Sequence, residues 1–220
     1  MNAPRLDPPW LTLDLAREMP VLSWAVNRPG LVRARRILGR EMRNADLPEH
    51  LDATGWLEAQ LAARAARDAV CFLTSCDIAQ FTTAEAESDD IRTRAVATVG
   101  LSNAESAGTR LTVVAQGWGT INIAVEIGAG LSEAARLETL GIATQARTAA
   151  IMAAGISLPT GPATGTGTDC IAIAAPEGDM RYARMHTGVG EAVGRAVYTA
   201  VARGVALWQS GETTREARNG

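Results

Sequence analysis

Lysine is absent from this sequence of 220 residues, and all 21 basic residues are arginine. A Schiff-base mechanism or a lysine nucleophile is therefore excluded, because the required amine is missing. The chain has only three cysteines, Cys71, Cys76 and Cys170, at no spacing typical of metal ligands. We interpret them as reduced thiols, which suit a reducing compartment, and we expect a cytoplasmic protein.

Several sequence signatures are missing as well. No apolar run reaches the roughly 18 residues that a membrane helix needs, and the N-terminus lacks the regions of a signal peptide. The sequence has no P-loop, dinucleotide fingerprint or serine-hydrolase elbow, and it lacks the His-Cys spacing of zinc deaminases. The net charge of -3 argues against nucleic acid as a partner. We expect no metal site, no membrane and no nucleic acid.

The composition is typical of a soluble globular protein, with 47% hydrophobic and 20% charged residues. This length is enough for one compact domain with a full core. We therefore assign residues 1–209 to a single domain. The last residues, 210–220, form a polar and charged tail that we expect to fray.

The apolar pattern predicts alternating strands and helices. Predicted strands are Leu11–Leu15, Val21–Val26, Val70–Thr74, Ile91–Val99, Leu111–Gln116, Ile121–Ile127 and Cys170–Ala174, and residues 33–42 fit either a strand or a helix. Predicted helices are Trp56–Ala66, capped by Asp52 or Thr54, a helix from Ser132 to about Ala154, and a last helix with an apolar stripe from Val189 to Val201. The predicted fold class is α/β (α+β), with helices covering a mainly antiparallel or mixed sheet.

Three segments at the ends of predicted strands combine glycine with small polar side chains. They are 100–104 (Gly-Leu-Ser-Asn-Ala), 119–123 (Gly-Thr-Ile-Asn-Ile) and 163–169 (Ala-Thr-Gly-Thr-Gly-Thr-Asp). Glycine lets the backbone approach a ligand and leaves N–H groups free to point outward. Each segment alone is typical of a turn. Together they predict one polar, glycine-lined site.

Two titratable residues are candidates for proton transfer. Asp169 stands where the third segment enters a strand. Its carboxylate can orient a water, act as a base, bind a substrate amide, or accept N–H groups of its own loop. His186 precedes the last helix and can exchange protons near neutral pH, although a lone histidine is more often structural. Glu191, in the first turn of that helix, fits a substrate contact or a partner of the helix dipole. Trp118, between two glycines in a predicted hairpin turn, is a candidate ligand contact.

The order of these motifs resembles the adenosylcobinamide amidohydrolase family. The resemblance rests on segments 100–104, 119–123 and 163–169, on Ala-Arg-Thr-Ala-Ala at 146–150, and on His-Thr, Gly-Glu and Gly-Arg-Ala-Val at 186–187, 190–191 and 194–197. It covers residues 95 to 201 well and the first ninety only loosely. Residues on the family's patterned positions are Asn103, Asn122, Thr166, Thr168, Asp169, His186 and Glu191.

The resemblance implies hydrolysis of the amide that joins a propionate arm of the corrin ring to aminopropanol. The product, adenosylcobyric acid, re-enters cobamide synthesis in salvage or remodelling. The corrinoid is then the substrate, and no cofactor is required. Two departures from the family's pattern are Gln145 and Arg147, where Glu and Lys are commoner, and the changed surroundings of His186 at 184–185 and 188.

Amide hydrolysis needs an activated water, a stabiliser for the oxyanion and an acid for the leaving amine. The catalytic candidates for base and acid are Asp169 and His186. The oxyanion donor is the amide of Asn122 or Asn103, or the backbone N–H groups of the loop 164–168, and a nucleophile at Thr168 or Thr166 stays open. The substrate-binding candidates are Asn103, Thr120, Gly165, Thr166, Gly167, Glu191 and Trp118. Two other functions stay open: a corrinoid-binding protein without activity, and an amidohydrolase that prefers complete cobamides such as pseudocobalamin. A homo-oligomer is also left open.

Overall fold

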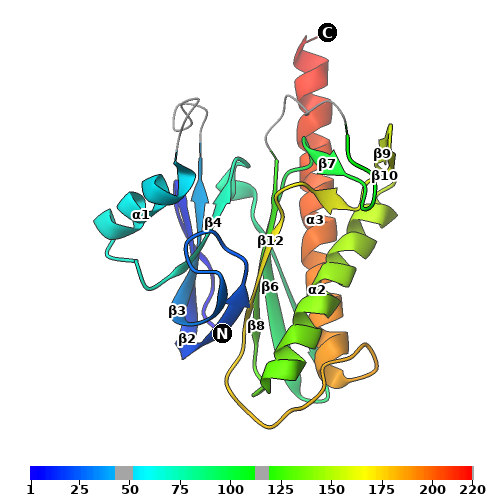
Figure 1. The fold of residues 1–220 in the computed structure, drawn as a ribbon. Helices are drawn as coiled ribbons and strands as arrows, with labels where there is room; N and C mark the ends of the chain where they lie inside the picture. Colours follow the sequence, from blue (N-terminus) through cyan, green and yellow to red (C-terminus); the bar gives the residue numbers. More distant parts are fainter. Residues whose placement is uncertain (43–51, 112–118, 220) are drawn as a thin grey trace.

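The computed structural model describes residues 1–42, 52–111 and 119–219, and it shows a mixed α/β fold around an eight-stranded sheet (Figure 1). The sheet order is β4-β3-β2-β12-β8-β6-β5, with β1 paired to β2. These strands are β1 (Arg5–Asp7), β2 (Trp10–Ser23), β3 (Gly30–Glu41), β4 (Val70–Thr74), β5 (Thr82–Ser88), β6 (Ile91–Val99), β8 (Ile121–Ile127) and β12 (Cys170–Ala174). The β3–β4 and β8–β12 pairs are parallel and the other pairs are antiparallel, so the predicted mixed sheet is confirmed.

Three helices cover the sheet. The helices α2 (Glu133–Ala153) and α3 (Gly188–Asn219) lie side by side over β5, β6, β8 and β12, whereas α1 (Ala53–Ala63) lies beside β3 and β4 (Figure 1). Asp52 caps α1 by accepting the N–H groups of Thr54 and Gly55, each at 3.1 Å. Ser132 caps α2 as predicted. These caps satisfy N–H groups that have no partner inside the helix.

Alanine and valine bring α2 and α3 close to the sheet and to each other. Fully buried side chains on α3 follow steps of three and four and confirm the predicted stripe: Val189, Val193, Ala196, Val197, Ala200 and Val201. Ala135, Ala143 and Ala150 form the corresponding buried face of α2. Short side chains on both helices allow a dense core with the isoleucines of β8 and β12.

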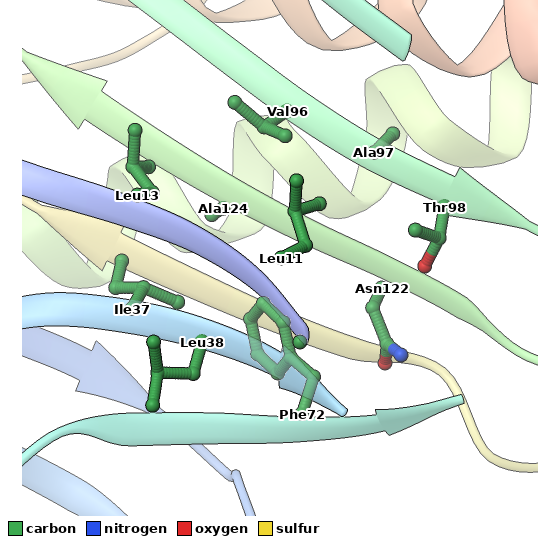
Figure 2. Close-up of a pocket in the computed structure, with 11 residues that line it drawn as sticks. Leu11, Leu13, Ile37, Leu38, Phe72, Val96, Ala97, Thr98, Asn122 and Ala124 are labelled. Carbon is green, nitrogen blue, oxygen red and sulfur yellow. The ribbon is translucent and has the colours of Figure 1, made fainter. Parts of the chain in front are cut away.

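The sheet curls, so that strands from its two halves pack together in a second core. Phe72 of β4 and Val96 of β6 stand far apart in the sheet order, yet both belong to one buried cluster with Leu11, Leu13 and Ile37. Figure 2 shows these side chains converging on a small apolar cavity, with Thr98 and Asn122 at one end. The curl therefore brings the end of β4 close to the start of β8, where the amide of Asn122 donates to the carbonyl of Leu73 at 2.8 Å.

Several predicted boundaries are wrong. Residues 11–15 and 21–26 are not two strands: β2 is continuous from Trp10 to Ser23, with an irregularity in its pairing between Asp14 and Met19. The ambiguous residues 33–42 belong to the strand β3, and β5 was not predicted because its exposed face carries glutamates. The predicted strand Leu111–Gln116 and its hairpin turn lie almost wholly outside the described residues.

The last helix is longer than its apolar stripe predicts. Its backbone continues through Asn219 and includes most of the tail 210–220, whose fraying stays a prediction. Nowhere in the described ranges does a helix combine the length and the hydropathy that crossing a membrane requires.

Candidate active site

The three glycine-containing segments meet at one edge of the sheet, as the sequence predicts. In the parallel pair β8–β12, Asn122 stands opposite Cys170, so the residues that precede both strands are neighbours. In the antiparallel pair β6–β8, Val99 stands opposite Ile121, so the residues that follow β6 reach the same edge. A second link is the short pairing of β7 (Ala104–Glu105) with β11 (Gly165–Thr166).

A cavity of about 520 Å³ opens at this edge. One wall is polar and contains five of the predicted site residues: Asn103, Thr120, Asn122, Thr168 and Asp169. The other wall is mainly apolar and was not predicted; it includes Trp24, Ala25, Val26, Met42, Phe72 and Leu73. These residues come from the ends of β2, β3 and β4, where the sequence offers no chemical motif and only the curl of the sheet brings them close.

The carboxylate of Asp169 holds the polar wall together. Its Oδ1 accepts the N–H of Ile121 at 3.1 Å and the hydroxyl of Thr166 at 2.5 Å, and its Oδ2 accepts the N–H of Thr166 at 3.0 Å. Its Oδ2 also forms an ion pair with Arg147 of α2. Asp169 is thus bonded to its own loop, to the start of β8 and to a helix, and both side chains of the ion pair are largely buried.

Arg147 is a site residue that the sequence did not identify. The sequence marked it only as a departure from the family's pattern, and nothing in its spacing indicates a partner 22 positions later. Burial lowers the pKa of the Arg147 guanidinium by penalising its charged form, although arginine stays protonated in proteins. The ion pair with Asp169 offsets this desolvation.

Hydroxyl groups of the polar wall hold its loops in register. The hydroxyl of Thr168 donates to the carbonyl of Gly119 at 3.1 Å, and the hydroxyl of Thr120 donates to the carbonyl of Thr168 at 2.9 Å. The amide of Asn103 approaches the hydroxyl of Thr168 at 3.5 Å. The two threonine hydroxyls thus tie the loop before β12 to the residues that begin β8.

Two glycines of the third segment differ in their surroundings. A Cβ on Gly165 would lie 2.3 Å from Arg147 Nη1 and 2.6 Å from Asp169 Oδ2, so the ion pair requires glycine at this position. Gly167 is exposed and would meet nothing within 4 Å. The structure therefore gives Gly165 a packing role beside Asp169, and it assigns no such role to Gly167.

The structure does not bring His186 and Glu191 to this cavity. Asp169 precedes β12, whereas His186 follows it in the loop before α3, at the other end of a strand about 16 Å long (Figure 1). His186 is exposed, and Glu191 accepts the hydroxyl of Ser88 at 2.7 Å and pairs with Arg195. Their roles stay predictions, and Trp118 lies outside the described residues.

This placement predicts that His186 is not needed for proton transfer at the cavity. We expect His186→Ala to change the turnover number by less than about twofold, because general acid–base catalysis contributes about 10²–10⁴-fold when a group takes part. Steady-state turnover of the two proteins across pH 6 to 8 measures this. A hundredfold loss in the variant, with an unchanged unfolding temperature, would place the histidine in the reaction.

Cysteine chemistry is disfavoured at the cavity. Cys71 and Cys170 line it, but burial raises the pKa of both thiols, that of Cys170 to about 12. A thiol with so high a pKa is almost fully protonated at neutral pH and is a poor nucleophile. In the part of the chain that the structure describes, no group of three or more His, Cys, Asp or Glu side chains is placed to hold a metal ion.

A known protein family matches nearly the whole chain. The family described as CbiZ, adenosylcobinamide amidohydrolase, matches residues 3–213 of the 220. The chain belongs to the adenosylcobinamide amidohydrolase family. The matched span includes every residue of both cavity walls. It also includes residues 3–90, whose motifs resemble the adenosylcobinamide amidohydrolase family only loosely.

Other comparisons add little to the adenosylcobinamide amidohydrolase assignment. No curated protein matches the sequence significantly. Among solved structures, the chain is similar to the PH0078 protein from Pyrococcus horikoshii OT3, at 9% identity and a TM-score of 0.45, over 90% of this chain and 77% of that one. A TM-score of this size does not establish a shared fold.

Proposed function

We propose that this protein hydrolyses the amide between the corrin propionate arm and aminopropanol in adenosylcobinamide. The products are adenosylcobyric acid and 1-amino-2-propanol, and the reaction serves cobamide salvage or remodelling. The observation that carries the proposal is the family match, which spans nearly the whole chain. The cavity supports it, because amides and hydroxyls line one wall and suit an amide-fringed substrate.

The proposed reaction adds water to the amide carbonyl. Asp169 is the only carboxylate among the described cavity residues, so we assign it the proton of the attacking water. Rotation of the whole Thr166 side chain away from Oδ1 would free that oxygen for the attacking water. The C–N bond of the tetrahedral intermediate then breaks, and the proton held by Asp169 passes to the leaving amine.

We assign Asn122 the role of oxyanion donor. Its amide donates one N–H to the carbonyl of Leu73, which fixes the side chain and leaves the second N–H for a ligand. The side chain lines the cavity, and its neighbours on β8 are fully buried. A donor held in place before substrate binds requires little reorganisation in the reaction.

We expect Asn122→Ala to lower the turnover number by about 10²–10³-fold, the loss typical for one oxyanion donor. Thr98→Val is the matched control. Thr98 stands opposite Asn122 in the β6–β8 register, and its buried hydroxyl has no hydrogen-bond partner in the described structure (Figure 2). Thr98→Val should therefore keep turnover within about twofold. Equal turnover in Asn122→Ala and Thr98→Val would show that Asn122 takes no part in the reaction.

The substrate is tested by comparing adenosylcobinamide with a complete cobamide. Both carry the same amide, but the nucleotide loop of the complete molecule adds bulk to the aminopropanol arm. We expect release of 1-amino-2-propanol from adenosylcobinamide, measured by mass spectrometry after derivatisation. Faster hydrolysis of the complete cobamide would assign the enzyme to that substrate, and corrinoid binding without any hydrolysis would make it a binding protein.

A further inference from the structure

The apolar wall of the cavity ends in two exposed hydrophobic residues. Trp24 and Val26 follow β2 directly, line the cavity, and expose 44% and 53% of their surfaces. Between them, Ala25 is buried and fixes the backbone. Exposed apolar side chains that gather at a cavity mouth are typical of a ligand-binding surface.

The ring of Trp24 is held in one orientation. Its indole N–H donates to the backbone carbonyl of Asp169 at 2.7 Å, across a distance of 145 residues in the sequence. The polar atom of the ring is thus satisfied, and the remaining exposed surface is apolar. A side chain fixed before binding loses little rotamer freedom when a ligand arrives. The same bond places the ring beside the residue that we assign as the base.

One wall of the cavity suits an apolar ligand surface, and the other suits polar groups of a ligand. Trp24 and Val26 expose apolar surface at the cavity, whereas Asn103, Asn122 and Thr168 present amides and a hydroxyl. A corrinoid has matching parts, because its macrocycle is broad and flat and its edge carries amide arms. An amide arm that reaches Asn122 leaves the ring at the mouth of the cavity.

On the basis of the proposed function, we infer that Trp24 binds the corrinoid by packing against the face of the corrin ring, with Val26 extending the same contact. Trp24 then binds substrate and product alike, since hydrolysis leaves the ring unchanged. Loss of such uniform binding raises KM and leaves kcat nearly unaltered. Asn122 acts on the amide alone and lowers kcat.

Adenosylcobyric acid is the probe that isolates this contact, because it keeps the macrocycle and lacks the scissile amide. We expect Trp24→Ala to weaken its binding, measured by calorimetry, by about tenfold or more, as for a central aromatic anchor. Trp24→Phe keeps a ring and should lose about threefold. Leu31→Ala is the control, since Leu31 is 49% exposed and outside the cavity; it should bind like the wild type.

Each outcome separates the inference from the proposed function. Weaker binding in Trp24→Ala alone, with KM for adenosylcobinamide raised and kcat within about threefold, supports the inference. Binding of Trp24→Ala within twofold of wild type, or an equal loss in Leu31→Ala, overturns it and leaves the hydrolase intact. A wild-type protein that binds the acid but does not hydrolyse adenosylcobinamide overturns only the proposed function. Failure to bind either corrinoid overturns both.

Discussion

Asp169→Asn is expected to lower turnover of adenosylcobinamide by at least about 10²-fold, the lower bound for loss of a general base. The substitution also leaves Arg147 buried without its counter-charge, and breaking a buried ion pair by removing one partner costs roughly 3–5 kcal/mol. Steady-state kinetics and thermal unfolding measure the two effects. Asp169→Asn should show both the lower turnover and the lower unfolding temperature.

A double variant separates catalysis from folding. In Asp169→Asn combined with Arg147→Met, the unpaired charge is replaced by an apolar side chain of similar length. We expect the unfolding temperature to recover towards that of the wild type, because a buried pair can be exchanged for hydrophobic residues at little cost. Turnover should stay low. Recovery of turnover together with stability would show that Asp169 only holds the loop in place.

Gly165→Ala is expected to have the second-largest effect. The new Cβ would displace Arg147 Nη1 and Asp169 Oδ2, and both are ends of buried side chains whose movement breaks the ion pair. We expect turnover to fall by more than tenfold, and overpacking to destabilise the fold by about 1–3 kcal/mol. Turnover assays and thermal unfolding provide the readout.

Gly167→Ala is the matched control, because it lies two residues away in the same loop and its Cβ would meet nothing within 4 Å. This variant should match the wild type in turnover and unfolding temperature. If both alanine variants behave alike, the close packing around Asp169 is not what the site depends on.

Local sequence patterns predicted the parts of the site that lie within single segments. The segment around Asn103 follows β6, and the segments around Asn122 and Asp169 lie at the starts of β8 and β12. The pairing of these three neighbouring strands is enough to bring the segments together. The apolar stripe of α3 was visible for the same reason, since its period is local. Chain order and periodicity carry this information without any knowledge of tertiary structure.

Local sequence patterns could not predict the contacts that the curl of the sheet creates. Trp24 and Phe72 reach the cavity only because β2, β3 and β4 fold over the other strands. Arg147 reaches Asp169 because α2 crosses the start of β12, which the alanine-rich pattern of α2 does not reveal. His186 follows β12 in the sequence, but it lies beyond the end of that strand that points away from the cavity.

Hydrolysis in water enriched in oxygen-18 tests the central claim most directly. Purified protein is incubated with adenosylcobinamide, and the masses of the corrinoid products are measured by mass spectrometry. We expect adenosylcobyric acid with one oxygen-18 atom in its new carboxylate and an equal amount of 1-amino-2-propanol. Asp169→Asn should release both products at least about 10²-fold more slowly. Unchanged adenosylcobinamide after incubation with a folded wild-type protein would contradict the proposed function.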